Sequence, residues 1–488
     1  MVVGLVAHCH NHTAHGYRND AMKPDMYPGR LFGSLLLAGG LLASSQGVAS
    51  GPQCSTLPPL PGGITTETVE SDTLCNIDFS STSVAICPKT WSTSPAALIY
   101  DLRDTSWAGK SGEFEAQVCP RGRKARDEAR AELAVFKHSM NGRDTSATYA
   151  PSSLLYADLA RWLGLRIYIP VAALQEFPRM WYLERVARYG EALTADKSSV
   201  RMLHAAWQAT VNTLSQPDDS TMATEMLSGD GASLWGVNLL FTGKRYGPEV
   251  NGTRASGWGK GQNRDFQQTA PFLLLRHDQP LSEATRLAIN EARTNSEMAQ
   301  ALPEDIAAQQ VQWWASEVIE IVLLDYLLGQ QDRIGNIDYQ WRWFWVEDQK
   351  VSSRPAKTAQ APADLAVYKP IRLRATWLND NDAGVRTSYA NFSRLTGMLD
   401  GLRRFDPMLY TRIRLLSRDF AAQGPVYQAI RDNYRIRSKE LEKIATRLAE
   451  IDTKLSAACK AGELRWDLDA TAIISAAKAD TAAVTCDI

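Results

Sequence analysis

The residues whose types and spacing best suit chemistry are Asp332, Asn336 and Asp382. The first two are four positions apart, and the third stands two positions before Gly384. Carboxylate and amide oxygens bind Mg²⁺ when phosphate oxygens complete its coordination. A further carboxylate can accept or orient the proton of an attacking hydroxyl. The pattern predicts phosphoryl transfer, in which Asp332 serves the acceptor hydroxyl while Asn336 and Asp382 hold the metal.

Predicted secondary structure would bring these groups together. An apolar helix over residues 311–328 leads into the loop that carries Asp332, and an aromatic strand over residues 339–346 follows it. A second strand-like run precedes Asp382, so a strand pair would return the chain to the loop. Asp and Asn also occur in turns that have no chemical role, and Asp380 is the nearest substitute for Asp382 as a ligand.

A cation for the phosphate groups is predicted at Lys137, near the end of a buried strand over residues 132–139. Because side chains alternate along a strand, Val135 and Lys137 share one face. Lys110 is a rival for the same role. A lysine at the end of a strand is also often a solvated tip.

A glycine-bearing turn over residues 106–112 precedes that strand, between strand-like runs over residues 96–102 and 113–118. Gly109 and Gly112 in this turn would let the backbone approach a phosphate group. A single Gly-x-x-Gly pattern is a weak signal for such a site.

The order of these elements resembles the atypical protein-kinase-like group that includes the secretory-pathway (Golgi casein) kinases, HipA, the CotH spore-coat kinases and the phosphatidylinositol kinases. The residues that carry the resemblance are Gln331-Asp332-Arg333-x-x-Asn336 and Asp382-Ala383-Gly384, and the predicted order spans residues 95–455. The resemblance implies an α+β, two-lobed protein-kinase-like fold with a small, mixed, β-rich N-lobe and a larger helical C-lobe.

The resemblance also implies a role for each residue of the pattern, with ATP as the donor and Mg²⁺ or Mn²⁺ as the metal. Arg333 is expected to be the structural partner of a buried carboxylate. The implied cofactor-binding residues are Lys137, Gly109 and Gly112, the catalytic residues are Asp332 and Asn336, and the metal ligands are Asn336 and Asp382.

Departures from the group's pattern leave alternatives open. Kinases of this group usually hold the lysine with a glutamate on the following helix. The helix predicted over residues 151–163, which Ser152 or Ser153 would cap, contains only Asp158 as an acid. The chain could therefore be a catalytically degenerate kinase fold that binds or scaffolds, or an enzyme that transfers AMP. For an active kinase we expect a protein hydroxyl as the acceptor, with a lipid or sugar hydroxyl as alternatives.

The first 49 residues have the pattern of an export signal. A short basic stretch after Met22 precedes an apolar run over residues 31–43, which is short for a membrane span. The small residues up to Ala49 fit a cleavage site. We expect an exported protein, periplasmic, secreted or in the secretory-pathway lumen, whose mature chain has no stable transmembrane helix. The rival interpretations are a buried apolar helix and an uncleaved lipid or membrane anchor.

Cysteine usage agrees with export. Six of the seven cysteines follow residue 49, and their spacings match no zinc pattern, so disulfides are expected rather than unpaired thiols. Four lie near one end of the mature chain, while Cys459 and Cys486 lie near the other and would close a loop. The net charge of −1 gives no reason to expect a nucleic-acid partner.

The sequence predicts five parts, with an insertion over residues 175–265 and a hinge strand at residues 272–275. The parts are an upstream extension and signal peptide (1–49), an irregular disulfide-tied segment (50–95), a kinase-like N-lobe with the insertion (96–280), a helical C-lobe with the catalytic loop (281–458) and a C-terminal tail (459–488).

Overall fold

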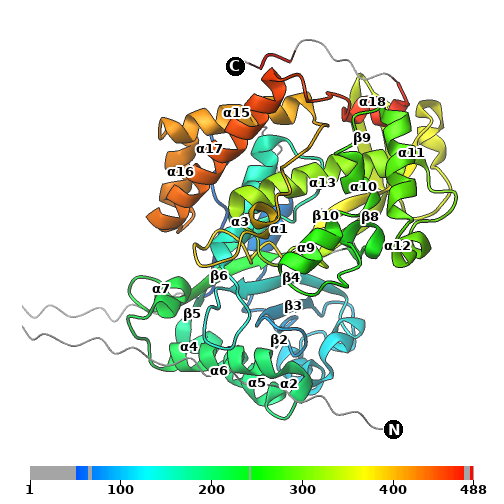
Figure 1. Ribbon diagram of the computed structural model, residues 1–488. Coiled ribbons are helices and arrows are strands. Elements are labelled where there is room, and N and C mark those ends of the chain that lie inside the picture. Colours follow the sequence, from blue (N-terminus) through cyan, green and yellow to red (C-terminus); the bar gives the residue numbers. More distant parts are fainter. Residues whose placement is uncertain (1–50, 64–68, 241–242, 478–483, 487–488) are drawn as a thin grey trace, which may run out of the picture. The chain divides into compact units, whose positions relative to one another are not determined.

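A six-stranded antiparallel sheet organises the N-terminal lobe in the computed structural model (Figure 1). The structure describes residues 51–63, 69–240, 243–477 and 484–486, so the predicted signal peptide lies outside the described residues. The strands, in their order across the sheet, are β1 (Gln53–Ser55), β5 (Ala172–Pro178), β6 (Ser233–Leu239), β4 (Ala131–His138), β3 (Ala97–Asp101) and β2 (Val84–Pro88).

Strand β4 has one face toward a core and one face toward the candidate site. Phe136 packs in a cluster with Phe177 and Trp207, whereas Val135 belongs to a separate cluster on the opposite face. Lys137 shares the face of Val135 because side chains alternate along a strand. The prediction of this strand and of its two faces is therefore confirmed.

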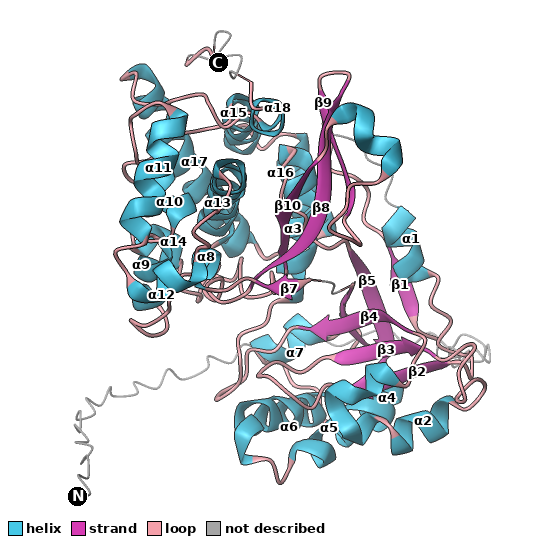
Figure 2. Ribbon diagram, turned by 90° about the vertical axis from the view of Figure 1, so that its right-hand side faces the viewer, coloured by secondary structure: helices cyan, strands magenta, loops and turns pink. Residues whose placement is uncertain are grey.

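Helices of the predicted insertion cover the core face of the sheet, as Figures 1 and 2 show for α4, α5 and α6. Trp207 of α6 is fully buried there. Gly190 of α5 permits its close approach, because a Cβ at that position would lie 2.6 Å from the indole ring. The helices of this lobe are α1 (Val69–Cys75), α2 (Ser111–Gln117), η1 (Cys119–Asp127), α3 (Ala150–Leu163), α4 (Arg179–Tyr182), η2 (Leu183–Ala187), α5 (Arg188–Thr194), η3 (Ser198–Val200), α6 (Arg201–Ser215) and α7 (Thr221–Met226).

A second antiparallel sheet lies in the C-terminal lobe. Its order is β10-β8-β7, and β9 also pairs with β8. The strand predicted over residues 339–346 and its partner are thus present. The segment that links them, predicted as a hairpin connection, contributes β9. The strands are β7 (Lys244–Arg245), β8 (Ile337–Glu347), β9 (Lys350–Pro355) and β10 (Ile371–Leu378).

The central helix α13 (Ala308–Leu328) matches the helix predicted over residues 311–328 and is tied to β10 by a buried carboxylate. Glu317 accepts hydrogen bonds from the backbone nitrogen and Oγ1 of Thr376, at 2.9 and 2.7 Å. Burial raises the pKa of Glu317 to about 8, although the hydrogen bonds from Thr376 oppose the shift. This contact fixes the strand that precedes Asp382 against the helix that precedes Asp332.

The remaining helices surround α13. The sequence predicts a hinge strand at residues 272–275, but the structure has α10 there, packed against α11 and α13. A short, fully apolar run does not distinguish a buried strand from a buried helix. Helices α8 and α10 pack within this lobe although the sequence assigns residues up to 280 to the N-lobe. The helices are α8 (Pro248–Asn251), α9 (Lys260–Phe266), α10 (Ala270–Leu274), α11 (Leu281–Ala292), α12 (Ser296–Ala301), η4 (Ala363–Tyr368), α14 (Phe392–Leu395), α15 (Pro407–Ala421), α16 (Pro425–Asn433), α17 (Ser438–Lys460) and α18 (Ala470–Ser475).

The predicted fold class is confirmed. The protein is α+β, with a small β-rich N-terminal lobe and a larger helical C-terminal lobe (Figure 1). The segment over residues 50–95, predicted to be irregular, instead contains β1, α1 and β2. Within the described ranges, none of the helices combines the length and apolar character that crossing a membrane requires.

Three disulfides are present in the part of the chain that the structure describes, and they divide between its two ends as the sequence predicts. Their pairings are Cys54–Cys75, Cys87–Cys119 and Cys459–Cys486. The last pair closes the expected C-terminal loop. Disulfides of this kind are typical of proteins from oxidising compartments.

Two further local predictions are wrong. The run over residues 113–118 forms most of α2 rather than a strand, because Phe114 and Val118 are four positions apart and are both buried on one helix face. The N-cap of α3 is Tyr149, not a serine. Ser152 instead donates a hydrogen bond from Oγ to the carbonyl oxygen of Asn381 at 2.6 Å, which connects this helix to the candidate site.

Candidate active site

The loop that carries Asp332 is built where α13 stops. Gly329 ends the helix in the left-handed conformation, with φ of 68°. On the far side of the loop, the Asn251 side-chain oxygen accepts hydrogen bonds from the backbone nitrogens of Gly335 and Ile337, at 2.9 and 3.2 Å. The loop is thus fixed at both ends before any ligand binds.

Arg333 crosses beneath this loop to a buried carboxylate, as the sequence predicts. Its Nε and one terminal nitrogen donate to the two oxygens of Asp325, at 2.9 and 3.0 Å. Its other terminal nitrogen donates to the carbonyl oxygen of Asn379 at 2.7 Å. Tyr156 of α3 also donates to Asp325. One buried guanidinium therefore connects the loop, α13 and the segment after β10.

The segment from residue 380 to residue 384 is held against both the loop and α3. The backbone nitrogen of Gln331 donates to the carbonyl oxygen of Ala383 at 3.0 Å, and that of Tyr149 donates to the carbonyl oxygen of Asp382 at 2.7 Å. A Cβ on Gly384 would lie 2.9 Å from Ser152 Oγ. Glycine at this position thus lets the helix and the segment approach each other.

Lys137 lies between the two aspartates that the sequence offers as ligands. Its Nζ is 2.9 Å from Asp380 Oδ1 and 3.0 Å from Asp382 Oδ2, and its side chain is 3% exposed. Burial alone lowers the pKa of Lys137, but the two carboxylates raise it more, so its pKa lies above the ordinary value. The structure therefore pairs these residues, which are more than 240 positions apart along the chain.

The only acid on α3 does not replace the usual helix glutamate. Asp158 pairs with Arg161 and accepts a hydrogen bond from Tyr434, on the side of α3 that faces the C-terminal lobe. The carboxylates that hold Lys137 come from the segment after β10. Because Lys137 already occupies these carboxylates, a metal ion bound here would compete with Lys137 for the same oxygens.

Two residues that the sequence does not single out contact the predicted catalytic pair. Trp258 Nε1 donates to Asp332 Oδ1 at 3.1 Å. Arg245 donates to Asn336 Oδ1 at 2.6 Å and also pairs with Asp338. Neither belongs to a recognisable motif, and both precede the loop by more than 70 positions.

The environment of Asp332 alters its acidity. Burial raises the pKa of Asp332, the hydrogen bond from Trp258 lowers it, and the negative charges of Asp380 and Asp382 raise it again. The net result is a pKa above the ordinary value for aspartate. A raised pKa makes a carboxylate a stronger acceptor for a hydroxyl proton at neutral pH.

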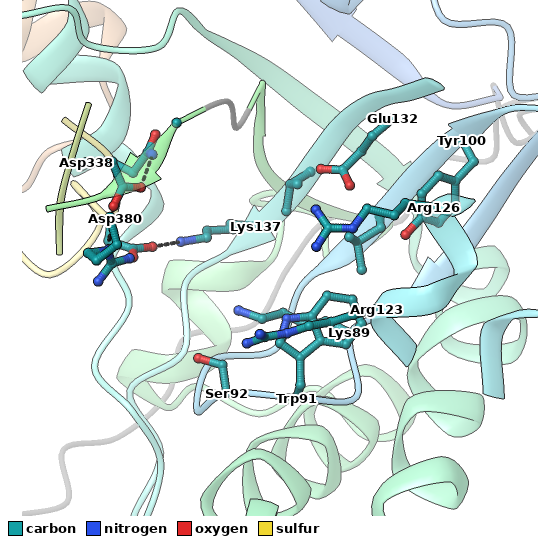
Figure 3. A pocket seen from close by; sticks show the side chains of 15 residues that line it. Lys89, Trp91, Ser92, Tyr100, Arg123, Arg126, Glu132, Lys137, Asp338 and Asp380 are labelled. Atoms are coloured by element: carbon teal, nitrogen blue, oxygen red, sulfur yellow. Dashed lines mark hydrogen bonds and ion pairs between the residues drawn. The ribbon is translucent and has the colours of Figure 1, made fainter. Parts of the chain in front are cut away.

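Two cavities meet at the candidate site. One, of about 610 Å³, is bordered by the predicted catalytic and metal residues. The other, of about 360 Å³, extends along β3 and β4 (Figure 3). Lys89, Ser92 and Asp380 line both. The first, called the acceptor-side cavity below, also includes Asp332, Asn336, Asp382, Trp258 and Met202. The second, the donor-side cavity, also includes Lys137, Arg123, Arg126, Leu98, Val135 and Arg245.

The donor-side cavity collects positive charge. Figure 3 shows Lys89, Arg123 and Arg126 extending into the same space as Lys137. The side chains that line this cavity include five cations, Lys89, Arg123, Arg126, Lys137 and Arg245, and three acids, Glu132, Asp338 and Asp380. Of these acids, Glu132 interacts with Arg126. Arg123 lies 5.7 Å from the centre of the Trp91 ring. An excess of cations over acids around one cavity is typical of an anion-binding site.

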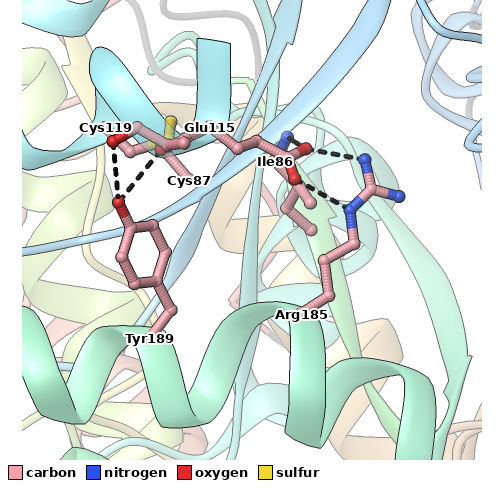
Figure 4. The surroundings of a disulfide bond; sticks show 7 residues. Ile86, Cys87, Glu115, Cys119, Arg185 and Tyr189 are labelled. Atoms are coloured by element: carbon pink, nitrogen blue, oxygen red, sulfur yellow. Dashed lines mark hydrogen bonds and ion pairs between the residues drawn. A yellow bond between two sulfur atoms is a disulfide. The ribbon is translucent and has the colours of Figure 1, made fainter. Parts of the chain in front are cut away.

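A disulfide fixes the segment that supplies the two arginines. Cys87 in β2 is bonded to Cys119 at the start of η1, and Figure 4 shows the contacts around this bond. Glu115 of α2 accepts hydrogen bonds from the backbone nitrogen of Ile86 at 2.9 Å and from Arg185 at 2.6 and 3.0 Å. The short helix η1 is therefore anchored to the sheet that forms the floor of the cavity.

The loop between β2 and β3, rather than the predicted glycine turn, borders both cavities through Lys89 and Ser92. Gly109 and Gly112 are not among the residues that line either cavity. Gly109 has φ of 75° and Gly112 lies in α2, so both serve local backbone geometry. The sequence gives no sign that the β2–β3 loop would border the cavities, because this loop contains no glycine.

Lys89 should make anion binding depend on pH. Burial and the nearby charge of Lys137 lower the pKa of Lys89 to about 8. A phosphate group binds the protonated amine, so ATP affinity should be constant below pH 8 and fall by up to about tenfold per pH unit above it. Calorimetric titration of ATP at pH 7 and pH 9 measures this effect.

The matched variants for that titration are Lys89→Met and Lys110→Met. The first should bind ATP more weakly at pH 7 and lose the decrease above pH 8. The second changes an exposed lysine outside both cavities and should behave as the wild type. An unchanged pH dependence in Lys89→Met would exclude Lys89 as the source.

The residues present suit a metal that shares its coordination with phosphate. No group of three or more His, Cys, Asp or Glu side chains suited to a metal occurs in the described part of the chain. Mg²⁺ usually takes one or two carboxylates and completes its coordination with waters and substrate phosphates. Asp380, Asp382 and Asn336 all border the acceptor-side cavity, and a metal that binds with a nucleotide would take their oxygens in place of Lys137 and Arg245.

No protein-family model matches the chain, and no curated protein matches its sequence. The chain is similar to a crystal structure of the Golgi casein kinase with Mn/ADP bound, with a TM-score of 0.38 and 11% sequence identity. The match covers 80% of this chain and 76% of that chain. An identity of 11% assigns no role to any single side chain of this protein.

Proposed function

We propose that this chain is an exported, ATP-dependent phosphotransferase that moves the γ-phosphoryl group to a hydroxyl. The observation that carries the proposal is the convergence of Asp332, Asn336, Asp380, Asp382 and Lys89 around one cavity. A phosphoryl group in transfer carries spread negative charge, and preplaced cations beside a proton-accepting carboxylate stabilise that charge.

Each group has one task in the proposed reaction. Asp332 orients the acceptor hydroxyl and takes its proton as the new oxygen–phosphorus bond forms. The bond between the γ-phosphorus and the bridging oxygen breaks, and ADP leaves with that oxygen. Lys137 and Lys89 balance charge on the phosphates.

Asn336 with Asp382, or with Asp380 in its place, would hold Mg²⁺ or Mn²⁺. A bound metal would neutralise negative charge on the phosphates. Asp380 is as well placed as Asp382, since both are paired with Lys137. The sequence favoured Asp382, so the two aspartates need separate tests.

A thermal unfolding experiment tests the donor and the metal together. Purified protein is heated with ATP alone, with Mg²⁺ or Mn²⁺ alone, and with both. At a nucleotide concentration one hundred times its Kd, binding should stabilise the folded state by about 2.7 kcal/mol. Removing the metal with EDTA should abolish most of that stabilisation.

The variants Asp380→Asn and Asp382→Asn show which carboxylate binds the metal, because the true ligand should lose the metal-dependent part of the shift. The absence of any shift with nucleotide and metal in the wild type would contradict the proposed function.

A second candidate function, AMP transfer, is favoured by the positive charge of the donor-side cavity. If the β- and γ-phosphates bound Lys89, Arg123 and Arg126, the α-phosphorus would lie nearer to Asp332. The acceptor oxygen would then bond to the α-phosphorus, and pyrophosphate would leave. Mass spectrometry of the product distinguishes the two reactions, because a phosphoryl group and an AMP group differ greatly in mass.

The acceptor is defined here only as a hydroxyl. The sequence favoured a protein hydroxyl and kept lipid and sugar hydroxyls as alternatives. Export is proposed from the three disulfides together with the signal-like sequence before residue 50.

A further inference from the structure

Trp258 is unusually exposed for its size and borders the acceptor-side cavity. The residue is 65% exposed, and it is the only tryptophan or phenylalanine of the described residues that is exposed rather than half-buried or buried. Single exposed apolar residues are common on protein surfaces and need no explanation by themselves. Trp258 differs because its Nε1 donates to Asp332, the proposed proton acceptor.

The loop around Trp258 is built to hold it. Gly257 and Gly259 flank it with φ of 79° and 83°, a backbone conformation that favours glycine. The carbonyl oxygen of Gly257 accepts from the backbone of Gln262 at 2.7 Å, and that of Gly259 accepts from the side chain of Asn263 at 2.7 Å. The loop is therefore fixed from both sides by α9.

Neighbouring side chains fix the loop and the ring further. Ser256 donates to Asp265 from its backbone nitrogen and its hydroxyl, at 2.9 and 2.7 Å. The indole ring meets Phe392 edge to face, with the ring centres 5.3 Å apart. A Cβ on Gly259 would lie 3.2 Å from the same phenylalanine ring. An exposed ring with this many fixed neighbours has a defined orientation.

We infer that Trp258 is a positioning residue for Asp332, which it orients through the indole N–H. The inference rests on the proposed function, in which Asp332 accepts the hydroxyl proton. With one carboxylate oxygen engaged by Trp258, the other oxygen would be left for the acceptor hydroxyl.

The decisive variant is Trp258→Phe, which keeps an aromatic ring against Phe392 and removes the N–H. With water as the acceptor, ATP hydrolysis should slow by about tenfold or more, the loss expected for one hydrogen bond to a charged group. Because Trp258 lowers the pKa of Asp332, the acidic limb of the pH profile should move to higher pH. ATP affinity should remain unchanged.

A matched control is Trp345→Phe on β8. Trp345 Nε1 also donates to a carboxylate, Glu347, at 3.2 Å, but it lines neither cavity. This variant should keep the wild-type rate and pH profile. If Trp258→Phe hydrolyses ATP at the wild-type rate, and its pH profile keeps the wild-type acidic limb, the positioning role is wrong.

A measurement without turnover separates this inference from the proposed function. In protein labelled with 5-fluorotryptophan, the ¹⁹F resonance of Trp258, assigned from its loss in Trp258→Phe, should move as Asp332 titrates. The movement should disappear in Asp332→Asn. A resonance that does not respond to the titration of Asp332 would overturn the inference, even if the protein binds ATP. A resonance that responds in a protein that binds no nucleotide would overturn the proposed function alone.

Discussion

Replacing Asp332 by asparagine is expected to lower the rate of phosphoryl transfer by about 10²- to 10⁴-fold, the usual contribution of a positioned general base. Asparagine has nearly the same shape and keeps an oxygen that can accept from Trp258 Nε1. The loop geometry set by Arg333 should therefore remain. What the variant loses is the capacity to take a proton from the acceptor.

The measurement is the initial rate of ATP turnover together with ATP affinity, which should change little. Asp278→Asn is the matched control, because its carboxylate is 63% exposed and pairs with Arg465 away from both cavities. The wild-type pH profile should have an acidic limb above the ordinary range for aspartate, since burial raises the pKa of Asp332. Full turnover in Asp332→Asn would exclude Asp332 as the proton acceptor.

Replacing Arg333 by methionine is expected to destabilise the protein by about 3–5 kcal/mol, the usual cost of breaking a buried ion pair from one side. The side chains of Arg333 and Asp325 are each 3% exposed. Without the guanidinium, Asp325 retains only the hydrogen bond from Tyr156 against the cost of burying its charge. The carbonyl oxygen of Asn379 also loses its donor.

Urea-induced unfolding measures the loss, and Arg465→Met is the control. Arg465 pairs with Asp278 on the surface, where such pairs contribute about 1 kcal/mol or less. The double variant Arg333→Met with Asp325→Leu should be more stable than Arg333→Met alone, because it leaves no unpaired buried charge. A loss in Arg333→Met no larger than in the surface control would contradict the structural role.

Much of the fold could be predicted because its elements have strong local patterns. The apolar periodicity of α13 and the alternation along β4 and β8 each specify one type of element. The predictions failed where a short apolar segment fits both types, as at residues 272–275, or where buried residues four positions apart were read as alternation, as in α2. The residues that pack against such segments lie far away in the sequence, and they decide whether the segment forms a helix or a strand.

The candidate site was predictable in part for a similar reason. Asp332 and Asn336 belong to one turn after a helix, and Asp382 precedes a glycine, so their side chains can be identified locally. Trp258 and Arg245 could not be found in this way. Each reaches the loop from another segment and belongs to no motif, and only tertiary contact reveals it.

By itself, the sequence determined the α+β lobes, the disulfide-bonded character and the short groups of carboxylates and amides, because these depend on composition and on neighbours along the chain. Tertiary structure alone decided that Lys137 pairs with both Asp380 and Asp382, and that the loop after β2 replaces the glycine turn at the cavities. Charges pair through space over distances of a few ångströms, and sequence separation does not encode which of two nearby acids, or which of two loops, will be within reach.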